Sequence, residues 1–99
     1  MAIYIILSTY TEQGARNVKD SPKRLNAAKA LARRLNGRFR QFFLTMGAYD
    51  IVAIAEFPND EAAAKFALTL ASKGNVRTTT LKAFSEADYR KIVRALPRG

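Results

Sequence analysis

Three segments of this chain carry large apolar residues at both odd and even positions, and this pattern constrains the fold more than any other. The segments cover residues 3–10, 39–46 and 51–57, and each is rich in the β-branched and aromatic residues typical of strands. In the first segment, one set of such residues alternates with another: Ile3, Ile5 and Leu7 against Tyr4, Ile6 and Tyr10. A strand with one wet face would alternate apolar and polar residues. We therefore predict a sheet with both faces covered.

Two segments between these strands have apolar residues at helical spacing. We predict a first helix that begins at Ser21 and ends at Gly37. A second helix is predicted to begin at a cap formed by Asn59 or Asp60 and to end at Gly74, which can supply a left-handed residue. The apolar stripes are Leu25, Ala28, Leu31, Ala32 and Leu35 in the first helix, and Ala63, Phe66, Ala67 and Leu70 in the second.

The remaining segments complete the order of strands and helices. Residues 75–84 favour extended structure, residues 11–20 form a polar connection, and Ser85 to Asp88 resembles a capping box that opens a short terminal helix. The apolar stripe of that helix is Tyr89, Ile92, Val93 and Leu96. The order βαββαβ, with right-handed crossovers, predicts a ferredoxin-like α+β sandwich of two helices on a four-stranded antiparallel sheet. We expect one domain over residues 1–99.

The second face of this sheet needs a cover that the two long helices cannot give. Exposed apolar patches of more than a few hundred square ångströms generally mark an interface, and a twofold dimer that packs sheet on sheet is the simplest closed solution. We therefore predict a homodimer or a higher homo-oligomer, with the fold of a dimeric α/β barrel. The alternative is a monomer whose terminal helix folds back over the second face.

Composition excludes several kinds of chemistry. The chain has neither cysteine nor histidine, so disulfides, thiolate nucleophiles, histidine bases and most zinc, copper and haem ligand sets are absent. We expect no metal site and no cofactor. The N-terminus lacks the pattern of a signal peptide, and no apolar run approaches the roughly 20 residues that span a bilayer. A cytoplasmic location is therefore the expectation.

The formal net charge of +9 raises the question of nucleic-acid binding. The positive residues gather in the first half of the chain: Lys23, Arg24, Lys29, Arg33, Arg34, Arg38 and Arg40. The favoured interpretation is a solvated helix face, because charge alone indicates solubility and non-specific attraction. Ile3-Tyr4-Ile5 resembles one of the two motifs of RNA-recognition sheets, but residues 50–55 lack the aromatic residues that the second motif needs. We therefore expect no nucleic-acid partner.

The connection at residues 46–50 joins two apolar strands and contains the strongest candidates for a site. Asp50 could act as a general base or anchor a ligand, and Tyr49 could stack or donate a hydrogen bond. The alternative is a turn in which Asp50 bonds nearby backbone. Glu56 and Arg77 could pair across the sheet or contact an anionic ligand, and Tyr4 and Tyr10 are expected at the dimer interface. The predicted ligand contacts are Tyr10, Tyr49, Asp50, Arg77 and Thr79.

Several motifs, in order along nearly the whole chain, resemble the GYD domain family. They are Gly47-Ala48-Tyr49-Asp50-Ile51-Val52, then Glu56 through Ala63, and Gly74-Asn75-Val76-Arg77-Thr78-Thr79-Thr80-Leu81. The segments 10–14 and 19–24 are also similar to that family. The resemblance implies a small bacterial or archaeal protein of dimeric α/β barrel type, in a family that is functionally uncharacterised. Ala48 interrupts the Gly-Tyr-Asp of the family name.

Three functions of different classes are compatible with these features. The favoured one is a binding or sensory module that holds a small apolar or weakly acidic molecule in the cavity of a barrel. The second is a cofactor-independent enzyme, similar to monooxygenases or isomerases of dimeric α/β barrel type, that uses Tyr49 and Asp50 for proton transfer. Binding of nucleic acid through the basic helix face ranks third.

Overall fold

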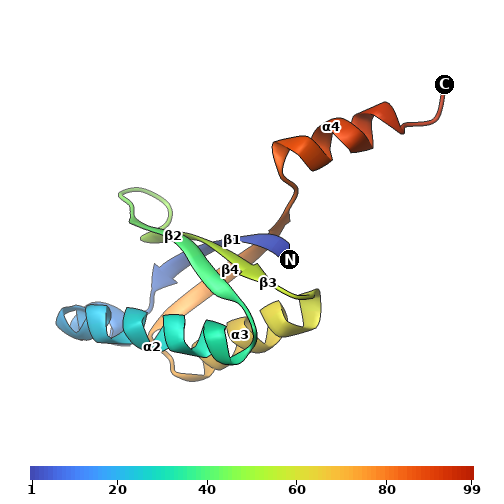
Figure 1. The fold of residues 1–99 in the computed structure, drawn as a ribbon. Helices are drawn as coiled ribbons and strands as arrows, with labels where there is room; N and C mark the ends of the chain where they lie inside the picture. The colour runs from blue at the N-terminus through green and yellow to red at the C-terminus, as the bar shows by residue number, and fades with distance from the viewer.

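One antiparallel sheet with the strand order β2-β3-β1-β4 organises the computed structural model, which describes all residues from 1 to 99 (Figure 1). The strands are β1 (Ala2–Tyr10), β2 (Arg38–Leu44), β3 (Ile51–Phe57) and β4 (Val76–Ala83). The predicted βαββαβ order and ferredoxin-like fold are confirmed, and the predicted strands differ from the observed ones only at their ends. A register shift between Phe39 and Gln41 puts a bulge into β2.

The two long helices, α2 (Ser21–Arg34) and α3 (Asp60–Ser72), lie on the same side of the sheet (Figure 1). The predicted cap of α3 is confirmed, because the Asn59 side chain accepts a hydrogen bond of 2.9 Å from the Ala62 N–H. Gly74 follows α3 with a φ of +78°, as its role predicts. Ser21, predicted as an N-cap, is instead the first residue of α2, and Asp20 precedes it.

The segment predicted as a polar connection contains two further elements, α1 (Glu12–Arg16) and the 3₁₀ turn η1 (Val18–Asp20). Thr11 begins α1, since its side chain accepts a hydrogen bond of 3.1 Å from the Gly14 N–H. The prediction of a connection was wrong here because α1 is short and has no apolar stripe, so that only the cap marks it.

The core lies between the sheet and the two long helices. The sheet surface that meets α2 and α3, called the helix face, is formed mainly by β1 and β3: Tyr4, Ile6, Ser8, Ala53, Ala55 and Phe57. Phe57 packs against Phe66 of α3, with ring centroids 5.2 Å apart, and against Tyr4 at 5.9 Å. Tyr4 is only 3% exposed. The expectation that Tyr4 lies at a dimer interface was therefore wrong, because α3 and not a second copy covers it.

The opposite surface, called the open face, is apolar and meets no other element of the chain. Its residues alternate with those of the helix face: Ile3, Ile5, Leu7, Val52, Ile54, Phe43 and Leu81, with Arg77 and Thr79 on β4. Phe43 is 48% exposed and Leu81 is 45% exposed. The predicted apolar character of both faces is thus confirmed, while the chain covers only one of them.

Glu56 lies at one end of the open face, in a cluster of charged residues. Its carboxylate lies 2.9 Å from Arg38 Nε and 3.0 Å from Arg40 Nη1. The hydrogen bond from Arg38 is the main cause that lowers the pKa of Glu56 below its ordinary value. The sequence left two roles open for Glu56, and the structure assigns it to pairing across the sheet.

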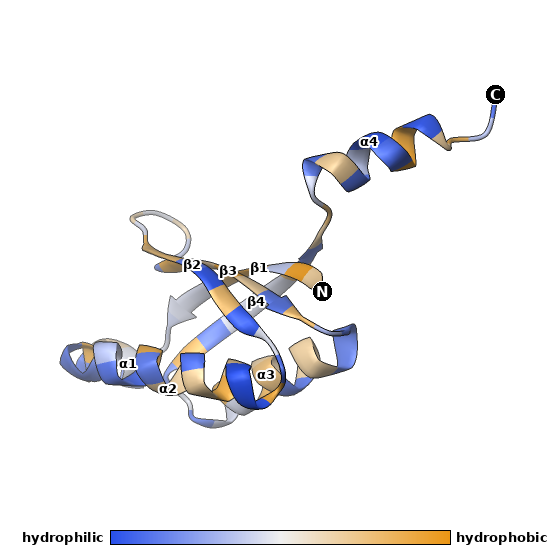
Figure 2. Cartoon of the chain, viewed as in Figure 1, coloured by the Kyte–Doolittle hydropathy of each residue, from blue (hydrophilic) through white to orange (hydrophobic).

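The terminal helix α4 (Glu86–Arg94) leads away from the sheet and the other helices (Figure 1). The radius of gyration of 15.3 Å exceeds the roughly 13 Å of a compact domain of about 100 residues. The alternative in which this helix folds back over the open face of its own chain is therefore not the observed one. Apolar and charged residues alternate along α4 (Figure 2), and its apolar stripe is solvent-exposed: Tyr89, Ile92, Val93 and Leu96. No helix combines the length and apolar content needed to cross a membrane.

A short polar chain connects the core to the start of α3. The Tyr4 hydroxyl donates a hydrogen bond of 2.5 Å to Asp60 Oδ1, and Lys82 Nζ lies 3.2 Å from the same oxygen. Burial, followed by the hydrogen bond to Asp60, raises the pKa of Tyr4 to about 12 from its ordinary value of 10.0. The hydrogen bond from Tyr4 lowers the pKa of Asp60. The fold therefore favours a protonated Tyr4 beside an ionised Asp60.

Replacing Tyr4 with phenylalanine should change how stability depends on alkaline pH. Because the folded pKa of Tyr4 lies above the unfolded one, its contribution is fully present below pH 10.0 and is lost as pH rises towards about 12. We expect Tyr4→Phe to lose about 1 kcal/mol near neutral pH and to show a shallower decline above about pH 10. Urea unfolding at a series of pH values measures both, with the exposed Tyr89→Phe as the control. An unchanged alkaline slope would contradict the assignment.

Candidate functional site

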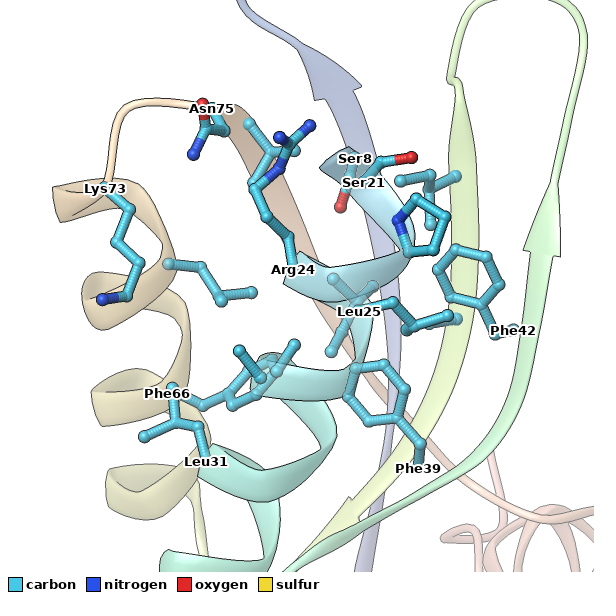
Figure 3. A pocket seen from close by; sticks show the side chains of 18 of the residues that line it. Ser8, Ser21, Arg24, Leu25, Leu31, Phe39, Phe42, Phe66, Lys73 and Asn75 are labelled. Atoms are coloured by element: carbon cyan, nitrogen blue, oxygen red, sulfur yellow. The ribbon is translucent and has the colours of Figure 1, made fainter. Parts of the chain in front are cut away.

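The side chains between the helices and the sheet leave a cavity of about 600 Å³ (Figure 3). Of its 23 lining residues, 15 are hydrophobic, which is the composition of small-molecule sites, and its volume lies within their range of roughly 300–1,000 Å³. The lining residues come from α2, α3 and all four strands, among them Leu25, Leu31, Phe66, Leu70, Ile6, Phe39, Phe42, Ile51 and Val76. Small residues, Ala28 on α2 and Ala53 on β3, line the cavity where larger side chains would fill it.

Polar residues gather at one end of this cavity, called the mouth, which is formed by Arg24, Lys73 and Asn75 (Figure 3). These residues come from the first turn of α2, the end of α3 and the segment before β4. Figure 3 shows Leu31, Phe39 and Phe66 at the other end of the labelled set. The cavity therefore has an apolar interior and a polar, positively charged end.

The short helix α1 holds the mouth together. Gln13 Nε2 donates to the Lys73 carbonyl at 3.2 Å and to Asn75 Oδ1 at 3.0 Å. Arg24 Nη1 donates to the Asn17 carbonyl at 2.9 Å. Gly14 packs so closely that a Cβ at this position would lie 1.9 Å from the Asn75 carbonyl oxygen. Only glycine fits this approach, so α1, which the sequence reading missed, frames the site.

The charged groups that line the cavity have one sign. Arg24, Arg34 and Lys73 are among the lining residues, and no aspartate or glutamate is. None of these three cations takes part in any of the six ion pairs of the structure. The positive potential at the cavity is therefore not neutralised by a carboxylate in direct contact.

Asp50, predicted as a candidate base or ligand contact, is bound to main-chain groups. Its Oδ2 accepts a hydrogen bond of 2.9 Å from the Tyr10 N–H, and its own N–H donates to the Ser8 carbonyl at 2.9 Å. Its carbonyl accepts from the Thr45 N–H at 2.8 Å. Asp50 thus connects the loop between β2 and β3 to the end of β1, which is the structural alternative that the sequence left open.

The other predicted contacts are divided between the two faces of the sheet and the loop. Tyr10 lines the cavity on the helix face, so the expectation that it lies at the dimer interface was wrong. Arg77 and Thr79 pair with Thr9 and Leu7 of β1 and therefore lie on the open face. Tyr49, which is 39% exposed, lies in the loop, and no hydrogen bond involves its hydroxyl. The five residues do not form one site, and of these only Tyr10 reaches the cavity.

The sequence reading did not find Arg24, Lys73 and Asn75 as site residues. The interpretation of the basic residues as one solvated helix face included Arg24. It did not distinguish Arg24 from the other positive residues of that face. The signal that could have separated it is the pair of alanines, Ala27 and Ala28, beside Leu25, because small residues on the core side of a helix leave room beneath it.

Two substitutions should separate a structural role of the loop from a functional one. Asp50→Ala should lower the free energy of unfolding by about 1–3 kcal/mol, because it leaves the half-buried Tyr10 N–H without an acceptor. Tyr49→Phe should change it by less than about 0.5 kcal/mol, because the hydroxyl has no partner. Chemical denaturation measures both. A stable Asp50→Ala variant that loses binding or turnover would instead make Asp50 a functional residue.

Comparison with known proteins agrees with this architecture. The pattern that defines the GYD domain matches residues 4–93. A protein of Thermus thermophilus named glutamine synthetase and cystathionine beta-lyase binding protein is 35% identical over 89 residues, which cover 89% of this chain and 94% of that protein.

Two solved structures have the same fold. FFRP-DM1 superposes with a TM-score of 0.60 at 16% identity, over 85% of this chain and 100% of its own. TTHA0845 from Thermus thermophilus superposes with a TM-score of 0.54 at 22% identity, over 99% of this chain and 100% of its own. Identities this low show the fold alone, whereas the match along residues 4–93 shows the family. The chain belongs to the GYD domain family.

Proposed function

We propose that this chain is a homodimeric binding module that takes up a small, largely apolar molecule in the cavity between α2, α3 and the sheet. The observation that carries the proposal is the cavity of about 600 Å³ with its 15 hydrophobic lining residues. A rigid sheet forms its floor and two helices form its walls, which is a common arrangement for sites that exist before the ligand arrives. A sensory role would follow if the bound molecule changed how the module meets its partners.

Assembly into a homodimer is the second part of the proposal. Only 12 of the 99 residues are buried in the single chain, and the residues of the open face lie on an uncovered apolar surface. Two such faces would pack sheet on sheet at about the 10 Å spacing of β-sandwiches, and a twofold axis closes the assembly. Arg77 and Thr79 would then face the partner's sheet, which would make them interface residues in addition to the ligand contacts predicted from sequence.

An enzymatic role for Tyr49 and Asp50 is the weaker proposal. The Asp50 carboxylate already accepts a hydrogen bond from the main chain of β1, and neither residue lines the cavity. A general base must reach the proton that it removes. A substrate in the cavity would therefore lie apart from both groups.

Binding to another protein is a second candidate function. The relative from Thermus thermophilus is named for the two enzymes that it binds, and α4 of this chain offers a surface for such a contact. Its stripe of Tyr89, Ile92 and Val93 is between 45% and 60% exposed, and an amphipathic helix can lay such a stripe into a groove of a partner. The two functions are compatible, since α4 lies apart from the cavity.

Filling the cavity should abolish binding of a neutral apolar probe. Wild-type chain should bind 1-decanol, and Ala28→Phe should weaken that binding at least about tenfold because the new ring takes the ligand's space. Ala64→Phe, at an exposed position of α3 outside the cavity, is the matched control and should bind as wild type does. Isothermal titration calorimetry measures affinity, and circular dichroism checks that each variant is folded.

Two outcomes decide between the candidates. Absence of decanol binding to wild type, or equal binding by folded Ala28→Phe, would contradict uptake in the cavity. If the module serves only a protein partner through α4, both Ala28→Phe and Ala64→Phe should still bind that partner fully.

A further inference from the structure

We infer that the molecule held in the cavity is an amphipathic carboxylate, whose head is bound at the mouth by Lys73 and Arg24 and whose apolar chain lies between α2 and α3. This inference rests on the proposed function and adds the chemical class of the ligand.

The sign of the lining charges selects an anion. Three lining residues are cationic and none is acidic, so a cationic ligand would meet only like charge. A neutral ligand would gain nothing from these charges and would leave the exposed Lys73 without an ionic partner. A carboxylate head would supply that partner and gain charge-assisted hydrogen bonds, which are about twice as strong as neutral ones.

The position of the head follows from the end of the cavity at which two of the three cations lie. Arg24, Lys73 and Asn75 lie at this end, with Lys73 at the end of α3 and Arg24 on α2 (Figure 3). Gln13 of α1 donates to the Lys73 carbonyl and to the Asn75 side chain, and the Asn17 carbonyl accepts from Arg24. Ser21, the first residue of α2, also lines the cavity. The positive end of the dipole of this 14-residue helix therefore lies at the same place.

Arg34 is the third lining cation, at the opposite end of α2. It lies ten positions after Arg24, which corresponds to about 15 Å along the helix axis. Arg34 therefore cannot join the cluster at the mouth. A single site for the head at the mouth follows, with the chain of the ligand directed along α2.

The number of free donors favours a monoanion over a dianion such as a phosphate. Arg24 already donates to the carbonyls of Asn17, at 2.9 Å, and Gly14, at 3.5 Å. Lys73 Nζ has no carboxylate partner, so one ammonium group is the main free charge at the mouth. One negative charge is matched by this arrangement.

The interior requires an apolar body for the same ligand. Leu25, Leu31, Phe39, Phe42 and Phe66 line the space beyond the mouth (Figure 3). Burial of a hydrocarbon chain there stabilises the complex with each CH₂ group that leaves water, and a small polar acid cannot gain this free energy. An alkyl or aryl carboxylate satisfies both ends of the site.

The test compares decanoate with 1-decanol, which have the same chain length and differ in the charge of the head. Calorimetric titration of the full chain should show decanoate binding about tenfold tighter than decanol at low salt. Lys73→Gln should weaken decanoate binding about tenfold and leave decanol binding within about twofold. Lys73 is exposed, so this variant should fold. Arg24→Gln is less suitable because it also removes the contacts to Asn17 and Gly14.

Lys23→Gln provides the matched control. Lys23 is an exposed residue of the same turn of α2 as Arg24 and does not line the cavity, so the variant loses the same charge outside the mouth. Decanoate affinity should stay at the wild-type value. Equal losses in Lys23→Gln and Lys73→Gln would overturn the inference, because they would indicate general attraction by the net charge of +9.

The remaining outcomes separate this inference from the proposed function. Decanol and decanoate could bind with equal affinity, and Lys73→Gln could leave both affinities unchanged. The cavity would then bind apolar ligands without distinguishing their polar groups, and only the inference of a carboxylate would fail. If neither probe binds wild type, the proposed function fails together with it. Decylamine binding as tightly as decanoate would also overturn the choice of charge.

Discussion

A sheet of four strands has two faces, and the helices of this chain cover only one of them. This imbalance underlies the other features of the structure. Apolar residues at both odd and even positions of β1 and β3 place aliphatic groups on each side, while α2 and α3 lie together on the helix face. The core is consequently small, with nine buried hydrophobic residues. The open face and α4 are left uncovered by the chain itself, and an apolar surface of this kind generally marks an interface.

The covered face has its own departure from close packing. Most protein interiors leave few voids larger than a water molecule, but here small side chains on α2 and β3 leave a cavity of about 600 Å³. The cavity is supported by a well-packed neighbour, the aromatic cluster of Phe39, Phe57 and Phe66, with centroid distances of 5.2 and 5.7 Å. Rigid packing beside an unfilled volume is how a fold maintains a site without a ligand. The proposed dimerisation and the proposed binding therefore use opposite faces of one sheet.

Much of the fold could be predicted because local signals agreed with the global order. Asn59 and Gly74 carry cap chemistry that depends on a few neighbouring atoms, and their roles were confirmed. The alternation along β1 correctly separated two apolar sets, but periodicity cannot tell which set meets the helices. Tyr4 was for that reason placed at an interface, although its packing on Phe57 and its bond to Asp60 put it in the core.

The candidate site was less predictable because it depends on contacts between distant segments. Asp50 and Tyr49 stood out as polar residues between strands, yet Asp50 binds the main chain of β1. Arg24 at the mouth is far in the sequence from Lys73 and Asn75. All three hydrogen-bond to residues in or just after α1, a helix with no apolar stripe. A cavity is the volume that side chains from several segments leave unfilled, so the pattern of one segment cannot predict it. Charge composition indicated a basic half but not its convergence at one end of a cavity.

Sedimentation equilibrium measures whether the open face joins two copies of this chain. We expect a mass of about twice 11.0 kDa at micromolar concentration. Ile5→Lys, at the centre of the open face opposite Ile54, should shift the mass towards that of a single chain because it would bury a charge. Leu68→Lys, on α3 and already 71% exposed, should leave the dimer intact. A wild-type mass of 11.0 kDa across the concentration range would contradict the account.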